Sequence, residues 1–488
     1  MAFRIRSLLR HLLRFGFYGA AGVFLTLVVV FVLYMNGRPD LSVWHLAELD
    51  EEFTEDSDVS SFEDYLALED RLFKQLDDKV YAEITPGQMT QINRFHKLSY
   101  SDPGRWPQNW NRSYEMPIAK PRAGVLLLHG MSDSPYSLRS LAEGLHDAGA
   151  YVVGLRIPGH GTAPSGLIRV TWQDMAAAVS IAMKHLAEKT PGLPLHIVGY
   201  SNGGALAVNY VLGAVDHPES PQVTSIALLS PEIGISKVAV LAVWQARLGA
   251  LLGLDKLSWN DILLEYDPYK YGSFAVNAGD VAYRLTAEIQ RQLTSLNKNG
   301  KIKNIPPILA FSSMVDATVS APTLIAGLFN RIPEGGHELV LFNINSKADI
   351  EPLLKWDPTK MFSVLQENPG RTFTLSLVTN KSPDSSEVIL ARKHPGDDAE
   401  TVETDLNLSW PEDVYSLTHV ALPFPPDDPL YGGAEKLTSP GIHLGDIALR
   451  GERGVLHIPP AEMLRLRWNP FYDHLEDKTL EFFDLQKK

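Results

Sequence analysis

The pattern of apolar and charged positions sets the first part of the chain apart from the rest. No charged residue occurs from Phe15 to Met35, and these 21 residues can span a bilayer as a helix that rises about 1.5 Å per residue. The positions before this span carry arginines and no acid, and no small-residue cleavage site typical of a signal peptide follows it. We therefore predict a transmembrane anchor within residues 1–38. Its arginine-rich tip is expected in the cytoplasm and the rest of the chain outside it, on the periplasmic side in a bacterium.

Residues 39–110 follow the anchor and are rich in acids, with apolar positions at helical spacing in part of the segment. Between residues 46 and 81 this pattern is typical of a solvated stalk or a membrane-proximal helix. Residues 101–114 are rich in Pro, Trp and Asn and indicate an irregular lead-in. We expect this segment to connect the anchor to the globular part without a special role of its own.

From Arg122 onward, apolar runs alternate with helical patterns. The stretches "AGVLLLHG", "YVVGLRIPGHG", "LPLHIVGYS" and "VTSIALLSP" have the composition of buried strands, and amphipathic stretches separate them. Buried strands that alternate with helices are typical of a mostly parallel sheet covered on both faces. We therefore predict an α/β fold.

Two long stretches interrupt this alternation. The first, residues 236–300, is expected to form a cap over the carboxyl ends of the strands, and Gln245 and Arg247 argue against a second transmembrane helix there. The second, residues 347–415, contains two strand-like runs with acid-rich links. The predicted organisation is thus a core in two parts, residues 111–235 and 301–346, the two insertions, and a C-terminal part from 416 to 488.

Composition narrows the possible chemistry. The 488-residue chain has a formal net charge of −14, which argues against a nucleic-acid partner because phosphate binding needs a basic surface. It has no cysteine, so the sequence excludes disulfides, a thiol nucleophile and cysteine ligands for zinc. It also has no H-E-x-x-H or comparable cluster, and we expect neither a metal nor an organic cofactor.

Ser201 is the candidate nucleophile. It stands in a G-x-S-x-G pattern from Gly199 to Gly203, between an apolar strand and the helical stretch "NGGALAVNYV". A sharp strand-to-helix turn lifts a serine hydroxyl above the sheet, and flanking glycines are needed where side chains would collide. Amides at the start of the following helix can then stabilise negative charge that develops beside the serine.

The stretches "VLLLHGMSDSPYSLRSLAEGL", "LRIPGHGTAP" and "GYSNGG", in this order, resemble the α/β-hydrolase superfamily. Within it they resemble the serine carboxylesterases and monoacylglycerol-lipase-like enzymes. The resemblance is strong over residues 123–235 and weaker over 305–345, and it leaves out the N-terminal segment and both insertions. It implies an α/β-hydrolase fold with an oxyanion hole formed by the backbone amides of Met131 and Asn202. It also implies a structural role for the side chain of His129.

Asp316 is the candidate catalytic acid. It follows the buried strand in "PPILAFSSMVD", where the superfamily carries its carboxylate, and the chain order Ser, Asp, His is the rule for this fold. Its role would be to fix the tautomer of the histidine and to stabilise the imidazolium. Glu232, at the end of the preceding strand in "LLSPEIG", is the alternative.

His419 is the candidate base. It occurs in an S-x-T-H loop after the second insertion, and this loop resembles the histidine loop of the superfamily, delayed by the insertion. His337 lies closer to Asp316 in the sequence, but it precedes the strand "ELVLFNI". It therefore falls at the amino end of a sheet whose active site is expected at the carboxyl ends. His160, in "PGHG", is expected to pack within a loop. Histidines without a comparable context are His394, His443 and His474.

Together these residues predict a membrane-anchored serine hydrolase that cleaves carboxylic esters through an acyl-enzyme. An apolar cap and a bilayer anchor favour lipid-like ester substrates. One alternative is a thioesterase or amidase with the same triad. Another is a non-catalytic scaffold, in which the insertions bind a partner and the hydrolase core is vestigial.

The predicted topology can be tested with reporter enzymes fused to the C-terminus of the full chain. Alkaline phosphatase should be active in such a fusion, because it matures only where disulfides form and the C-terminal part is expected outside the cytoplasm. A cytoplasmic reporter at the same position should be inactive. The opposite pattern of reporter activity would contradict the predicted orientation.

Overall fold

The computed structural model describes residues 2–234, 254–316, 318–348, 358–396, 400–433, 439–445 and 465–486. Within these residues a ten-stranded sheet forms the centre, in the order β1-β3-β2-β4-β5-β8-β9-β10-β11-β12. Its neighbouring strands are parallel from β3 to β10, whereas β1 pairs antiparallel with β3, β11 with β10, and β12 with β11. The strands are β1 (Tyr114–Met116), β2 (Ala123–Leu128), β3 (Ala150–Leu155), β4 (Leu195–Tyr200), β5 (Ser225–Leu229), β8 (Ile308–Ser313), β9 (Glu338–Phe342), β10 (Thr374–Asn380), β11 (Glu387–Lys393) and β12 (Thr401–Ser409).

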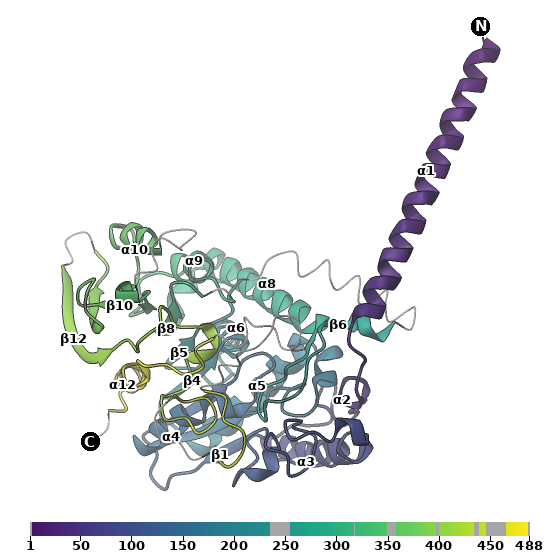
Figure 1. Ribbon diagram of the computed structural model, residues 1–488. Helices are drawn as coiled ribbons and strands as arrows, with labels where there is room; N and C mark the ends of the chain where they lie inside the picture. The colour runs from purple at the N-terminus through teal and green to yellow at the C-terminus, as the bar shows by residue number, and fades with distance from the viewer. Residues whose placement is uncertain are drawn as a thin grey trace.

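Helices cover both faces of this sheet (Figure 1). One face carries α5 (Trp172–Lys189), α6 (Asn202–Asp216), α8 (Val276–Lys298) and α9 (Ala321–Gly327). The opposite face carries α4 (Arg139–Asp147) and α12 (Tyr472–Phe482). The predicted α/β fold, a mostly parallel sheet with helices on both faces, is confirmed.

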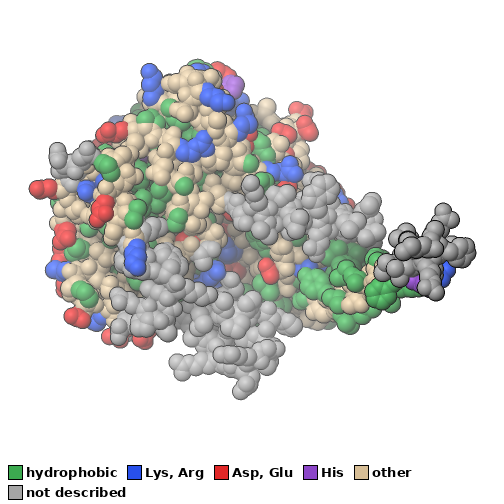
Figure 2. All heavy atoms as spheres, turned by 90° about the horizontal axis from the view of Figure 1, so that it is seen from above, with side chains coloured by type: hydrophobic (Ala, Val, Ile, Leu, Met, Phe, Trp, Pro, Cys, Tyr) green, Lys and Arg blue, Asp and Glu red, His purple; other side chains and the backbone are tan. Residues whose placement is uncertain are grey.

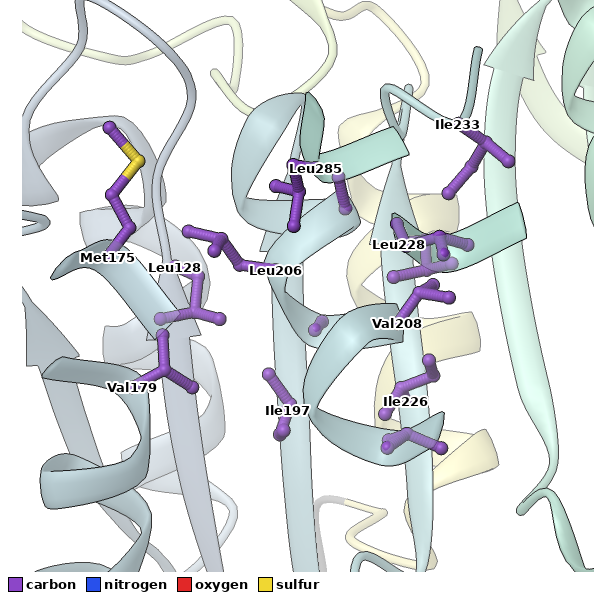
Figure 3. Close-up of a cluster of buried hydrophobic side chains, with 14 of the residues drawn as sticks. Leu128, Met175, Val179, Ile197, Leu206, Val208, Ile226, Leu228, Ile233 and Leu285 are labelled. Atoms are coloured by element: carbon purple, nitrogen blue, oxygen red, sulfur yellow. The ribbon is translucent and has the colours of Figure 1, made fainter. Parts of the chain in front are cut away.

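The alternation of side chains along the strands builds a core on each face. Ile197 and Ile226 lie on the face that α5, α6 and α8 cover, where they pack in one cluster with Leu206 and Leu285 (Figure 3). The residue after Ile197, Val198, belongs to the cluster on the opposite face. Successive residues of a strand point to opposite faces, so a strand buried on both sides is apolar throughout. Full burial of each such Leu or Ile contributes about 1.5–3 kcal/mol.

The chain begins with α1 (Ala2–Gly37), which projects from the globular part as an isolated helix (Figure 1). The stretch Arg14–Gly37 is long and apolar enough to cross a membrane, although the signal sequence of an exported protein would meet the same criterion. From Phe15 onward the large apolar side chains of this helix are exposed, and they form the apolar surface that extends from the body in Figure 2.

Polar contacts tie the end of α1 to the region predicted as the cap. Arg38 donates hydrogen bonds to the carbonyl groups of Trp259, at 2.8 Å, and Asn260, at 3.0 Å. Lys256 donates to the carbonyl of Arg38 at 3.1 Å and pairs with Asp40 at 2.8 Å. The exit of α1 is therefore fixed against the short strand β6 (Trp259–Asp261).

The range predicted as a cap, residues 236–300, contains two structural parts. Residues 235–253, which include the apolar run interrupted by Gln245 and Arg247, lie outside the described residues. After them β6 pairs with β7 (Phe274–Ala275), and the long helix α8 then packs against α6 on one face of the sheet. The second half of this range therefore contributes to the core.

The second predicted insertion extends the central sheet. Its strands β10, β11 and β12 continue the sheet beyond β9, and α10 (Pro358–Gln366) precedes them. In Figure 1 this extension lies on the side of the molecule away from α1. The strand-like character of "RTFTLSLVT" and "EVILARK" is confirmed, and both runs belong to the same sheet as the nucleophile strand.

The acid-rich lead-in packs against the core, and the expectation of a solvated stalk is wrong for its helix α3 (Phe62–Lys79). Tyr65 and Leu68 of this helix are buried in the core cluster of the sheet. The structure also contains a short helix, α2 (Val43–Leu46), in this segment. The apolar positions at helical spacing thus mark a face that the core covers, and the acids of this helix other than buried Glu69 occupy the remaining positions.

A buried ion pair fixes this lead-in to the loop after β3. The guanidinium of Arg156, which is fully buried, donates to Glu69 at 3.1 Å and makes two hydrogen bonds of 3.0 Å to Glu52. Burial raises the pKa of Glu69, and the charge of Arg156 and hydrogen bonds from Ser113 oppose that rise. Arg156 and its carboxylate partners therefore stabilise one another's charges in a site shielded from water.

We predict that Arg156→Ala lowers the free energy of unfolding by about 3–5 kcal/mol, because it leaves two carboxylates without their cation. Urea unfolding of the full chain in detergent, followed by intrinsic fluorescence, measures the change. The control is Arg71→Ala, which removes an exposed pair with Glu51 and should cost at most about 1 kcal/mol. Equal losses in the two variants would contradict the structural role of Arg156.

Candidate active site

Ser201 occupies a strained turn between β4 and α6. Its backbone dihedrals are φ 55° and ψ −118°, outside the regions that residues with a side chain ordinarily adopt. A Cβ atom on Gly203 would lie 2.0 Å from the carbonyl oxygen of Leu128, and one on Gly199 would lie 2.5 Å from that of Gly203. The turn is therefore closed to any other residue at these two positions, as the G-x-S-x-G pattern predicts.

The structure brings His419 and Asp316 to this turn. His419 Nε2 lies 3.1 Å from Ser201 Oγ, and Nδ1 of the same ring lies 3.1 Å from Asp316 Oδ2. The other carboxylate oxygen of Asp316 accepts hydrogen bonds of 2.8 Å from the amides of Thr318 and Val319. All three site residues are shielded from solvent to within a few per cent of their side-chain surface.

The electrostatics favour a charged Asp316. Burial alone would raise the pKa of this carboxyl group, but the hydrogen bond and charge of His419 and the two backbone amides lower it more strongly. The net pKa is below the ordinary value, so Asp316 is a carboxylate at neutral pH. A carboxylate at Nδ1 holds the proton on that nitrogen and leaves Nε2 free to accept one from Ser201.

Two hydrogen bonds join the ends of the second insertion and position the loop that carries His419. The backbone amide of Asn345, just after β9, donates to the carbonyl of Tyr415 at 2.7 Å, and its side-chain amide donates to that of Val414 at 2.8 Å. The chain that returns from β12 therefore meets β9 again at the carboxyl end of that strand. His419 follows a few residues later, where an uninterrupted loop after β9 would also place it.

The His-Gly turn lies directly above the serine. A Cβ atom on Gly130 would lie 3.1 Å from Cβ of Ser201, so the backbone of this turn approaches the nucleophile closely. Within the described part of the chain, neither the amide of Met131 nor that of Asn202 donates a hydrogen bond to the protein. Both amides are therefore available as donors next to Ser201, as an oxyanion hole requires.

The other histidines make structural contacts. His337 precedes β9 at the amino edge of the sheet, where its Nδ1 accepts the amide of Ile308 at 3.1 Å, and burial lowers its pKa to about 4. His129 accepts the amide of Ile157 at 3.0 Å, and His160 lies within hydrogen-bonding distance of loop carbonyls. Outside the immediate site, His394 contacts Thr374, His443 the carbonyl of Gly432, and His474 the charges of Glu338 and Lys478.

A cavity of about 230 Å³ lies beside the site. Its walls mix aromatic and charged side chains, and two of its acids are already paired. Asp133 pairs with Lys270 at 2.8 Å, and Asp267 accepts the hydroxyl of Tyr431 at 2.7 Å. Its lining residues are Ser132, Asp133, Tyr200, Asp261, Leu263, Tyr266, Asp267, Lys270, Tyr271, Gly272, Phe274, Val420, Phe424, Tyr431, Arg465 and Arg467.

Several residues that support the site were not anticipated from the sequence. Tyr200 packs against the ring of His419 and donates to its backbone carbonyl at 3.4 Å. Buried Asp428 accepts hydrogen bonds from Tyr136 and from the amides of Leu430 and Tyr431. These contacts join segments far apart in the chain, and no local pattern in the sequence marks them. Among the described residues no cluster of His, Cys, Asp and Glu could hold a metal ion.

Comparison with known proteins agrees with this architecture. Residues 119–343 match the family model described as serine aminopeptidase, S33. Over 96 residues the chain is 36% identical to a thermostable monoacylglycerol lipase from Bacillus sp. (strain H-257), a match that covers 20% of this chain and 36% of the lipase. The chain thus matches about a third of the length of that relative.

The solved structures to which the chain is similar include two lipolytic enzymes. A chain described with the metagenome-derived lipolytic enzymes LipS and LipT is 24% identical, with a TM-score of 0.38, and the match covers 48% of this chain and 87% of that one. A soluble variant of monoglyceride lipase from Saccharomyces cerevisiae is 16% identical, with a TM-score of 0.38, and the match covers 47% and 82% of the two chains.

The sheet topology, the strained serine turn and the family match define the class of the protein. The described part of the chain has an α/β-hydrolase fold, and residues 119–343 match the S33 family model. Over 96 residues its sequence is also similar to a monoacylglycerol lipase, in line with the resemblance stated above.

We predict that His419→Ala reduces turnover of an ester substrate by about 10³-fold or more, because Ser201 then lacks a base. His337→Ala should change turnover little, because this side chain lies at the opposite edge of the sheet. Steady-state kinetics on the full chain in detergent, with circular dichroism to verify folding, measure both effects. A larger loss in folded His337→Ala than in His419→Ala would overturn the assignment.

Proposed function

We propose that the protein is a membrane-anchored serine hydrolase that cleaves carboxylic esters with a lipid-like acyl group. The observation that carries this proposal is the continuous line of 3.1 Å contacts from Ser201 through His419 to Asp316. The family match and the similarity to a monoacylglycerol lipase support the same type of chemistry.

The proposed reaction follows from the arrangement of these groups. Ser201 Oγ attacks the ester carbonyl while its proton passes to His419 Nε2, and Asp316 stabilises the resulting imidazolium. The amides of Met131 and Asn202 bind the oxyanion. His419 then gives its proton to the departing alcohol, and water, activated by the same histidine, releases the acid from Ser201.

The name of the family model raises a second candidate function, hydrolysis of an amide by an aminopeptidase. An aminopeptidase needs a carboxylate to bind the free amino group of its substrate. In the cavity beside Ser201, Asp133 is already paired with Lys270, and Asp267 with Tyr431 and a backbone amide. These pairings engage two of the three acids of the lining, and the third, Asp261, is exposed, so the comparison of ester and anilide hydrolysis below decides between the two functions.

The anchor suits a substrate that resides in a membrane. Helix α1 has the length and composition of a transmembrane segment, and Arg38 and Lys256 tie its end to β6. The residues Asp261 and Leu263, at and just after β6, line the cavity beside Ser201. The proposed substrate class is therefore a monoacyl lipid ester that reaches the site from the bilayer surface.

We predict that the full chain in detergent hydrolyses p-nitrophenyl esters and hydrolyses the corresponding p-nitroanilides at least 100-fold more slowly. A series of acyl chains from acetate to palmitate then measures the capacity of the site. Ser201→Ala should abolish turnover and labelling by a fluorophosphonate. Labelling without ester turnover would indicate the thioesterase or amidase alternative, whereas a folded protein that is not labelled would support the scaffold.

A further inference from the structure

Glu232 lies at the carboxyl edge of the sheet between the nucleophile and the acid. It follows β5, which stands between β4, the strand of Ser201, and β8, the strand that leads to Asp316. Its backbone amide donates to the carbonyl of Ser201 at 3.0 Å. Because His419 bridges Ser201 and Asp316, its ring spans the strand end from which Glu232 emerges.

Close backbone packing holds this segment in place. A Cβ atom on Gly204 of α6 would lie 2.7 Å from Pro231, and one on Gly234 would lie 2.3 Å from the side chain of Thr323 in α9. These contacts fix the backbone on either side of Glu232 against α6 and α9. Neither the first turn of α6 nor any position of α9 carries an ionisable residue.

The carboxyl group of Glu232 has one oxygen that the described part of the protein leaves without a partner. Its Oε2 atom is shielded from solvent and has no hydrogen-bond partner in the described part of the chain. Among the described residues, the charge of His419 acts on this carboxyl group, and the carboxylate of Asp316 contacts the same imidazole at Nδ1. A carboxyl oxygen that is buried without a partner is costly, so its presence beside His419 calls for a function.

We propose that Glu232 is a second carboxylate for His419. It stabilises through space the imidazolium that forms when Ser201 loses its proton, and it does so only when it is itself ionised. This inference rests on the proposed function of Ser201 and His419. Glu232 exchanges no proton with the substrate and acts only through His419, as a positioning residue. The proton still moves from Ser201 Oγ to His419 Nε2 and then to the leaving group.

The direction of the pH dependence follows from the burial of Glu232. Burial raises the pKa of this carboxyl from its ordinary value to about 7, and the charge of His419 partly opposes the rise. Below pH 7 the group is a neutral acid and gives His419 no support. Above pH 7 it is a carboxylate and assists. Because its folded-state pKa is above the unfolded-state pKa, the protein should lose stability as pH rises through this range.

The test compares the wild-type chain with Glu232→Gln, which mimics the protonated acid at every pH. The rate constant for labelling of Ser201 by a fluorophosphonate, measured from pH 5 to 9 on the full chain in detergent, reports nucleophile activation without reference to a natural substrate. We expect the wild type to react roughly tenfold faster than the variant at pH 9, and this ratio to fall to one or less below pH 6. In parallel, the Tm of the variant should rise relative to wild type between pH 5 and pH 8.

Controls and contrary outcomes separate this inference from the proposed function. Glu219→Gln, the same change at an exposed carboxylate on the loop after α6, should match wild type at every pH. Glu232→Asp, which keeps an ionisable group, should retain the pH-dependent ratio to Glu232→Gln. If the Gln variant does not fold, a wild-type pH–rate profile from pH 5 to 9 that requires two ionisations supports the proposal, and a profile that a single ionisation fits overturns it.

A ratio that does not change with pH would overturn the role of Glu232 while the proposed function stands. A folded wild-type chain that is not labelled at any pH would overturn the proposed function, and this inference with it.

Discussion

The position of His419 depends on the hydrogen bonds of Asn345, which join the two ends of the second insertion. The contacts of Ser201 and Asp316 depend in turn on His419. Asn345 donates to both Val414 and Tyr415, and its own side-chain oxygen accepts a hydrogen bond of 2.9 Å from Asn380 at the end of β10. These bonds join the start and the end of a long excursion at one point of the sheet. Because the entropic cost of closing a loop grows slowly with its length, such an excursion is tolerated once its ends are fixed.

The core of the fold could be predicted from the sequence because its signals are local. An apolar run such as "AGVLLLHG" indicates a buried strand, and the glycines around Ser201 indicate a close approach of backbone segments. The sheet extension and the packing of α3 could not be predicted in the same way. From the sequence Glu69 is expected to be solvated, because carboxylates are rarely buried. Its burial depends on Arg156, a partner far away in the chain.

In the candidate site, too, some residues could be predicted from local patterns and others depend on partners far away in the chain. Ser201 and Asp316 could be placed because each follows a recognisable strand, and His419 because the direction of the sheet separates it from His337. Their catalytic roles remain predictions. The contributions of Asn345 and Tyr200 could not be found from the sequence, because an amide or a phenol has no characteristic pattern until the tertiary structure supplies its partner.

The hydrogen bonds between Arg38 and β6 also bear on how such a protein would search for substrate. With α1 in a bilayer, the protein and its lipid would diffuse on the same surface, and encounters would occur in two dimensions. A flexible tether would leave the body free to tumble, but the contacts of Arg38 and Lys256 restrict its tilt. The cavity mouth would then sample few orientations toward the headgroups, which raises the effective concentration of substrate without any additional binding contact.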